Sequence, residues 1–225
     1  MIDIEREGFA LATEQLISFY DFIRLDYIEG NQKKGPASRD YTMIVIAATS
    51  GLRANEVEFL DTRDLYFENG LIETRFGKGF NGSGKRPRKT DFTDFAMDTM
   101  RYYLRKIRPR FPNADANPAL FLTEGGDRIS YSTMRYKLKR IVTAAKEAGI
   151  DLMPDLRWHD LRRSFATNYV EERGALKNVL LELAEKLGHS NLYTLHHYIK
   201  YNREYRTQAV EHMHRLLMPT DIEES

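Results

Sequence analysis

The sequence has no cysteine among its 225 residues, which excludes disulfide bonds and thiolate metal ligands. Long hydrophobic runs are also missing. The longest one, Met43–Ala48, is far shorter than the roughly 18 residues that span a bilayer. The first five residues include two acids, Asp3 and Glu5, and show no signal-peptide pattern. These absences fit neither a disulfide-stapled secreted scaffold nor a membrane protein, and we expect a cytoplasmic protein with a buried core.

Net charge is nearly absent as well, at +1 overall, but the charges are unevenly distributed. Residues 1–30 hold seven acidic and two basic residues, whereas residues 75–110 hold eleven basic and three acidic ones. Residues 131–163 are also basic, with eight basic and four acidic residues. Basic stretches of this size are typical of a surface that meets a polyanion, although Lys and Arg also solvate ordinary helices.

The hydrophobic pattern predicts a mainly α fold with one small antiparallel β-sheet (α+β). Asn69-Gly70 lies between two apolar segments and predicts a hairpin of residues 65–67 and 71–74, with a third strand within 88–92. A short strand is also expected at 119–122. Apolar residues three or four apart predict helices over residues 13–28, 38–50 (capped by Ser38), 54–60, 94–107, 130–148, 159–172, 176–187 and 203–217.

Three polar positions are candidates for phosphate chemistry. His159 and Arg162 are three residues apart at a helix start, so they share a face, where the guanidinium could bind two phosphate oxygens and the imidazole could move a proton. Arg53 follows a helix-ending glycine near the core and needs a partner, which could be Glu56 or a phosphate. His189 follows Gly188 on an irregular turn. Taken alone, His159 and Arg162 are more often a surface histidine with an unrelated arginine, and Glu56 could fully explain Arg53. His189 could equally be an ordinary loop side chain.

The basic loop between the predicted strands resembles a nucleotide-binding loop only superficially. Gly79–Lys85 matches G-x-x-x-x-G-K, but Arg86 replaces the Ser or Thr that would hold Mg²⁺, and the preceding strand belongs to a hairpin. A lysine loop that reaches into a DNA groove is the better functional interpretation, with a plain solvated loop as the alternative. The sequence contains no H-E-x-x-H metal motif and no G-x-S-x-G elbow.

The order of these elements resembles the catalytic domain of the tyrosine recombinases, the phage-integrase and Xer-like family. Gly51-Leu-Arg53-x-x-Glu56 comes first, followed by Gly77-Lys78-Gly79. His159-Asp-Leu-Arg162 then looks like the family's H-x-L-R box, and Leu187-Gly-His189-Ser with Tyr198 nine residues later looks like its L-G-H-S…Y box. The resemblance covers roughly residues 10 to 205.

The resemblance implies a role for each matching residue. Tyr198 would attack a DNA phosphodiester and form a 3′-phosphotyrosine, with Arg53 and Arg162 binding the non-bridging oxygens. Lys78, with Lys85 as its rival, would protonate the leaving 5′-oxygen. His159 would assist proton transfer at the tyrosine, His189 would add a hydrogen bond to the phosphate, and Glu56 would support Arg53. We expect DNA contacts from Lys85, Arg86, Arg88, Lys89 and Arg163.

The resemblance also implies partners and domain organisation. It implies double-stranded DNA as substrate, no metal, ATP or other cofactor, and a homotetramer assembled on DNA through a C-terminal helix, in a cytoplasmic protein associated with the nucleoid. We expect an N-terminal extension (1–11), a catalytic domain (12–202), and a C-terminal helix with an acidic tail (203–225). The chain is either an isolated domain of a longer parent or a natural short form. A DNA-binding accessory module that does not cleave, and a metal-dependent nuclease using His159 and His189, are the alternatives.

Overall fold

The computed structural model describes residues 10–75, 87–153, 155–174 and 177–188. The chain divides into two compact units, Met1–Phe165 and Ala166–Ser225. Helices dominate, and the three strands form one small antiparallel sheet, so the predicted fold class is confirmed. In these described ranges, no helix is long and apolar enough to cross a membrane.

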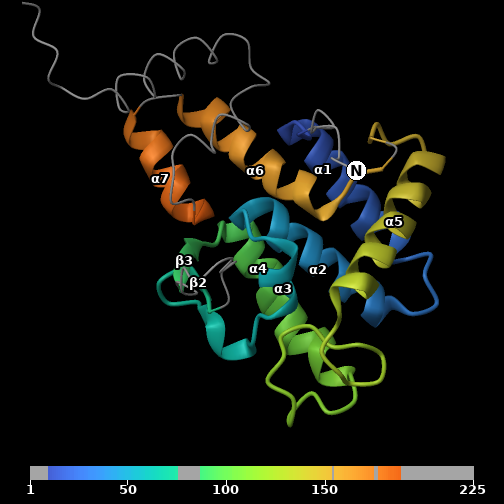
Figure 1. The fold of residues 1–225 in the computed structure, drawn as a ribbon. Helices are drawn as coiled ribbons and strands as arrows, with labels where there is room; N and C mark the ends of the chain where they lie inside the picture. The colour runs from blue at the N-terminus through green and yellow to red at the C-terminus, as the bar shows by residue number, and fades with distance from the viewer. Residues whose placement is uncertain (1–9, 76–86, 154, 175–176, 189–225) are drawn as a thin grey trace, which may run out of the picture. The chain divides into compact units, whose positions relative to one another are not determined.

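The first unit is built around the helix α2 (Lys34–Ser50), which is buried on nearly every face. Its residues 43–48 are almost entirely inaccessible to solvent, as their apolar run predicts. Neighbouring helices cover α2 (Figure 1). These are α1 (Thr13–Phe22) through its π-helical continuation η1 (Ile23–Tyr27), α4 (Asp94–Tyr102) with η3 (Tyr103–Ile107) and η4 (Arg108–Arg110), and α5 (Tyr131–Glu147).

The start of α2 differs from the prediction. The helix begins at Lys34 rather than after Ser38, and the Ser38 hydroxyl donates to the Lys34 carbonyl oxygen at 2.8 Å instead of capping a terminus. Pro36 explains the difference, because proline is tolerated in the first turn of a helix, where its missing N–H leaves no hydrogen bond unmade. Residues 34–37, which precede the predicted helix, are therefore helical.

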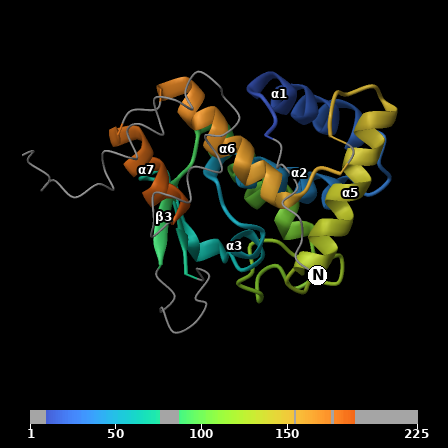
Figure 2. The same ribbon diagram turned by 45° about the horizontal axis from the view of Figure 1, so that its top comes forward.

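The sheet has the strand order β1 (Leu65–Tyr66), β2 (Leu71–Thr74) and β3 (Arg88–Asp91). Gly70 adopts a φ of 62° at the predicted hairpin turn, a conformation that favours glycine. Figure 2 shows the sheet at one edge of the first unit, close to the short helix α3 (Ala54–Glu58). This hairpin and the third strand confirm the predicted sheet.

The strand predicted at residues 119–122 is not part of this sheet. It forms two isolated bridges instead, between Asp61 and Ala119 and between Leu122 and Arg128. Its residues are buried, so their apolar character reflects packing in the core. The 3₁₀ turn η2 (Thr62–Asp64) follows the first bridge and leads into β1.

Two further helices agree with the predicted pattern. α6 (Trp158–Arg173) begins in the first unit and ends in the second, and α7 (Lys177–Leu187) lies in the second. The predicted apolar stripe of α7 is buried at Leu180, Leu183 and Leu187. The predicted helix 203–217 lies outside the described residues.

Candidate active site

A buried carboxylate organises the candidate site. Glu56 lies in the first turn of α3, and its side chain is only 1% exposed. Its Oε2 accepts a hydrogen bond from the Arg53 backbone N–H at 2.7 Å, while its Oε1 accepts one from Arg53 Nη1 at 3.0 Å. A glutamate at the third helical position commonly reaches back in this way to an unsatisfied N–H at the helix start. The predicted pairing of Arg53 with Glu56 is therefore present.

Two more arginines approach the same carboxylate from distant parts of the chain. Arg88, the first residue of β3, donates from Nη2 to Glu56 Oε2 at 2.6 Å. Arg162, in the first turns of α6, places Nη1 at 3.8 Å from Glu56 Oε2. The same Nη1 donates to the carbonyl oxygen of Gly51 at 2.6 Å. The 50–56 turn, the sheet and α6 thus meet at one carboxylate.

The C-terminal end of α2 provides the geometry for the Arg162 contact. Gly51 takes a φ of 64°, the left-handed conformation that commonly ends helices and that favours glycine. Its carbonyl oxygen thereby accepts a hydrogen bond from a guanidinium that is 111 residues away in sequence. Gly51 therefore ends α2 and also helps to position Arg162.

Positive groups outnumber negative ones around Glu56. Among the described residues, three guanidinium groups lie within 4 Å of this one carboxylate in a largely buried environment. Burial lowers the pKa of Arg88, and the attraction of Glu56 offsets this only in part. Arg53 is the most exposed of the three, at 27%, against 11% for Arg88 and 1% for Arg162. A buried excess of positive charge favours the binding of an anion, and forked guanidinium groups match the oxygens of a phosphate.

The other predicted site residues are exposed, half-buried or outside the described residues. His159 is exposed on the first turn of α6, one turn before the buried Arg162. Arg163 is half-buried, and Lys89 is exposed on β3 with its Nζ 5.2 Å from the centre of the Tyr66 ring. Five predicted site residues lie outside the described residues: Lys78, Lys85, Arg86, His189 and Tyr198.

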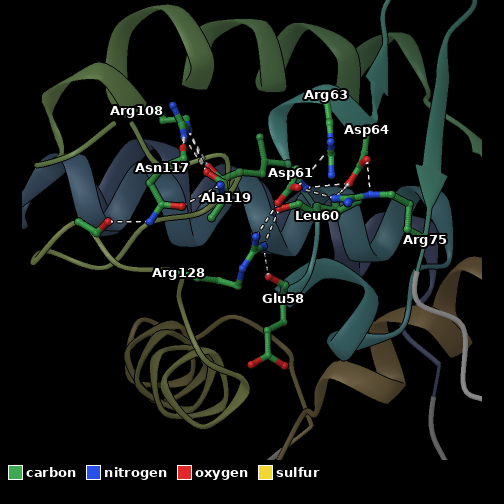
Figure 3. Close-up of polar contacts among 12 residues, drawn as sticks. Glu58, Leu60, Asp61, Arg63, Asp64, Arg75, Arg108, Asn117, Ala119 and Arg128 are labelled. Carbon is green, nitrogen blue, oxygen red and sulfur yellow. Dashed lines mark hydrogen bonds and ion pairs between the residues drawn. The ribbon is translucent and has the colours of Figure 1, made fainter. Parts of the chain in front are cut away.

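The sequence reasoning missed a second cluster of charges that follows α3. Asp61 is buried and accepts from Arg128 Nη2 at 2.5 Å, and Arg75 Nη2 lies 2.5 Å from its other oxygen. Arg75 also donates to Asp64 at 2.8 Å. Figure 3 shows Arg75 and Arg128 reaching Asp61 from two sides. The partners are 14 and 67 residues from Asp61, so no local spacing reveals this cluster.

This second cluster holds the end of α3 in place. Arg128 Nη1 donates to the carbonyl oxygens of Glu58 and Leu60, at 3.0 and 2.9 Å. Burial raises the pKa of Asp61, but the hydrogen bonds and charges of Arg128 and Arg75 outweigh it and leave the pKa below its ordinary value. The Asp61 cluster therefore supports, through the backbone, the helix that carries Glu56.

Arg108 performs a related structural task further along the chain. Its guanidinium donates to the carbonyl oxygens of Ala114, Asn117 and Ala119 at 2.6–2.8 Å. Figure 3 shows Arg108 beside Asn117 and Ala119. Arg75 and Arg108 both belong to the basic stretch 75–110, yet both are committed to internal contacts. The basic stretch is therefore only partly available to a polyanion. Across the described ranges, no three His, Asp or Glu side chains gather in a way that could hold a metal ion.

The chain is similar to known proteins over most of its length. The phage integrase family model matches residues 14–204. Tyrosine recombinase XerC of Alcanivorax borkumensis is 32% identical over 180 residues, which cover 79% of this chain and 53% of that protein. Tyrosine recombinase XerD of Ralstonia nicotianae is 30% identical over 175 residues, with 77% and 52% covered. The chain thus spans about half the length of the curated relatives it matches.

Solved structures share the fold. The Tn1549 transposon integrase superposes with a TM-score of 0.71 at 22% identity, over 95% of this chain and 67% of that one. XerA recombinase superposes with a TM-score of 0.68 at 21% identity, over 96% of this chain and 67% of that one. This chain belongs to the phage integrase family, and what it contains is the catalytic domain of a tyrosine recombinase.

Proposed function

We propose that the protein cleaves and rejoins DNA strands at a specific site through a covalent 3′-phosphotyrosine. The observation that carries this proposal is the convergence of Arg53 and Arg162 on Glu56, a buried carboxylate. Two guanidinium groups held in this way can bind the non-bridging oxygens of one phosphate and stabilise the negative charge that develops during displacement at phosphorus. A preorganised donor in such a site contributes on the order of 10²–10³ in rate.

The remaining roles follow from the family resemblance. The phenolic oxygen of Tyr198 forms a bond to phosphorus while the bond from phosphorus to the 5′-oxygen breaks. Lys78, or Lys85 in its place, supplies the proton to that oxygen, and His159 accepts the proton of the phenol. His189 donates a hydrogen bond to the phosphate. A phenol with a pKa near ~10 is a weak nucleophile at neutral pH, so it needs the surrounding cations.

Duplex DNA is the proposed partner. The structure of XerH, a site-specific recombinase, was solved bound to its difH substrate as a post-cleavage complex, and the Tn1549 integrase was solved with circular intermediate DNA. By analogy, this chain would work on chromosomal or mobile DNA in the nucleoid. Lys85, Arg86, Lys89 and Arg163 would contact the DNA, and four copies would assemble through the segment after residue 202. The covalent link stores the phosphodiester energy, so the proposed reaction uses neither ATP nor a metal.

A nicked suicide substrate tests the proposal. The substrate is a duplex carrying the recombination site, with a nick that lets a short 5′-hydroxyl fragment diffuse away after cleavage. We expect a protein–DNA adduct that survives denaturation, forms in EDTA, and disappears in Tyr198→Phe. The variant retains the ring and differs only in the hydroxyl, so its loss of product identifies the nucleophile.

Other outcomes would contradict the proposal and identify an alternative. Binding of the duplex without any adduct would favour an accessory module that holds DNA but does not cut it. Cleavage that EDTA abolishes and that Tyr198→Phe retains would favour a metal-dependent nuclease. An adduct that forms equally with Tyr198→Phe would assign the nucleophile to another residue.

A further inference from the structure

The third arginine of the cluster, Arg88, belongs to the inner face of its strand. Residues of a strand point alternately to opposite faces, and β3 follows this rule: Arg88 and Thr90 are shielded, whereas Lys89 and Asp91 are exposed. Thr90 donates through Oγ1 to the carbonyl oxygen of Ser50 at 2.9 Å. Arg88 binds Glu56 at 2.6 Å. The inner face of β3 therefore contacts both ends of the 50–56 turn, at Ser50 and at Glu56.

The contacts of Glu56 are divided unequally between its two oxygens. Oε1 accepts from Arg53 Nη1, whereas Oε2 accepts from the Arg53 backbone and from Arg88 Nη2. Arg162 is farther from Oε2, at 3.8 Å, beyond hydrogen-bond distance. Arg162 Nη1 instead makes its short contact with the carbonyl oxygen of Gly51 at 2.6 Å. Arg88 thus makes a hydrogen bond to Oε2 at 2.6 Å, and Arg162, at 3.8 Å, lies 1.2 Å farther from the same oxygen.

We propose that Arg88 is a positioning residue for strand cleavage: it binds Glu56 and thereby weakens the attraction of that carboxylate for the guanidinium groups of Arg53 and Arg162, which bind the phosphate. This inference rests on the proposed function of the site. Without Arg88, two arginines instead of three lie around the carboxylate. A phosphate would then compete with Glu56 for Arg162. The assignment differs from the DNA contact that the sequence predicts for Arg88, since its side chain is directed at Glu56 and is largely buried.

A double-mutant cycle tests this role. Single-turnover cleavage of the suicide substrate is measured for Arg88→Met in the wild-type background and in a Glu56→Gln background. In the wild-type background we expect the cleavage rate to fall about tenfold or more, the scale of coupling within one ion-pair network. In the Glu56→Gln background the same change should cost less than about threefold, because no carboxylate remains for Arg88 to neutralise.

Two companion variants keep the test interpretable. Arg88→Lys retains the charge and should restore part of the cleavage rate. If Arg88→Met does not fold, the same cycle is run with Arg88→Lys. Its smaller loss of rate should likewise vanish in the Glu56→Gln background. Lys89→Met, on the opposite face of the strand, should weaken DNA binding and show no coupling to Glu56. Removal of a cation that contacts phosphate reduces the steepness of log affinity against log salt concentration by about 1. We expect that change for Lys89 and not for Arg88.

The outcomes separate this inference from the proposed function. If wild-type protein forms no adduct, the proposed function fails and Arg88 has no reaction to serve. If wild-type protein cleaves and Arg88→Met cleaves at the same rate, the proposed function stands and the role of Arg88 is refuted. Equal losses in both backgrounds, with a weaker and less salt-dependent affinity for DNA, would make Arg88 a DNA contact.

Discussion

Arg53 and Arg162 share a carboxylate but differ in how they meet solvent. Arg53 is partly exposed, whereas Arg162 is fully enclosed and hydrogen-bonded to the backbone at Gly51. Removal of Arg162 therefore takes away a preorganised donor without stripping a charge from the surface of the protein. Its loss should affect the reaction far more than the encounter with DNA.

We predict that Arg162→Ala lowers the rate of adduct formation at least about 10²-fold, while DNA affinity changes little. The measurement is a single-turnover time course on the suicide substrate at saturating protein, paired with an equilibrium binding titration. Arg24→Ala is the control, because Arg24 is an exposed cation that pairs with Asp21 and belongs to none of the motifs. A normal cleavage rate in Arg162→Ala would remove that residue from the site.

Asp61 offers a pH-dependent test of the second cluster. Its folded-state pKa is lowered, so the unfolded chain binds a proton before the folded chain does as the pH falls. The stability that Asp61 contributes is therefore complete above its ordinary pKa of about 4 and is lost as the pH falls through the lowered value. Asp61→Asn should lose about 1–3 kcal/mol of unfolding free energy at pH 7, since Arg128 loses its carboxylate partner and Arg75 loses one of its two.

Denaturant unfolding at pH 7 and at several values below 4 measures this effect. The difference in unfolding free energy between wild type and Asp61→Asn should shrink as the pH falls. A difference that stays constant down to the lowest pH would show that the Asp61 carboxylate keeps no lowered pKa in the folded protein.

Local spacing explains which site residues the sequence could reveal. Glu56 lies three residues from Arg53, and their predicted ion pair is present in the structure. Arg88 is 32 residues from Glu56, and its partner depends on how β3 packs against the 50–56 turn. The sequence places Arg88 among the DNA-binding cations because charge alone does not distinguish a buried guanidinium from a surface one.

Elements that a short stretch of sequence specifies are the ones that the sequence predicts well. The apolar run in α2 and the Asn69-Gly70 turn each have a local physical cause, and both appear where expected. The predicted start of α2, at Ser38, is wrong by four residues. Pro36 lies in the first turn of the helix, where proline is tolerated. The segment 119–122 was predicted as a strand because its residues are apolar, but they are apolar for burial and form only isolated bridges.

The loop that contains Gly126 supplies a test at this scale. Gly126 has a φ of 88°, and a Cβ at this position would lie 2.4 Å from the carbonyl oxygen of Pro112. Gly149, after α5, has a similar φ of 84° with open space around it. Left-handed backbone alone costs an alanine about 1–2 kcal/mol, and overpacking adds about 1–3 kcal/mol.

We therefore predict that Gly126→Ala destabilises the protein by about 1–3 kcal/mol more than Gly149→Ala does. Thermal or urea unfolding of the two variants provides the comparison, and the matched φ values cancel the backbone contribution. Equal losses would mean that the loop relaxes away from Pro112 at little cost, so that its packing does not constrain the fold.

At the scale of the whole molecule, the basic stretch 75–110 overstates the surface available to DNA. Arg75, Arg88 and Arg108 are committed to carboxylates or carbonyl oxygens inside the fold. Composition can indicate a polyanionic partner, but only the packing shows which cations remain for it. The chain also spans about half the length of its curated relatives. The assembly of those longer proteins therefore does not carry over to it, and its own assembly has to be measured.

The proposed assembly depends on residues 203–225. We predict that a protein ending at residue 202 still binds one DNA site but no longer joins two sites into one complex. Native mass measurement of the DNA complexes, by light scattering or analytical ultracentrifugation, reports the number of copies and duplexes present. An unchanged synaptic complex after the deletion would contradict a role of the C-terminal segment in assembly.

The most direct measurement of the account maps the covalent bond itself. The adduct from the suicide substrate is digested with protease and nuclease, and the nucleotide-bearing peptide is sequenced by tandem mass spectrometry. We expect a 3′-phosphate on the peptide that contains Tyr198, with a free 5′-hydroxyl on the released fragment. A nucleotide attached to any other residue, or through a 5′-phosphate, would contradict it.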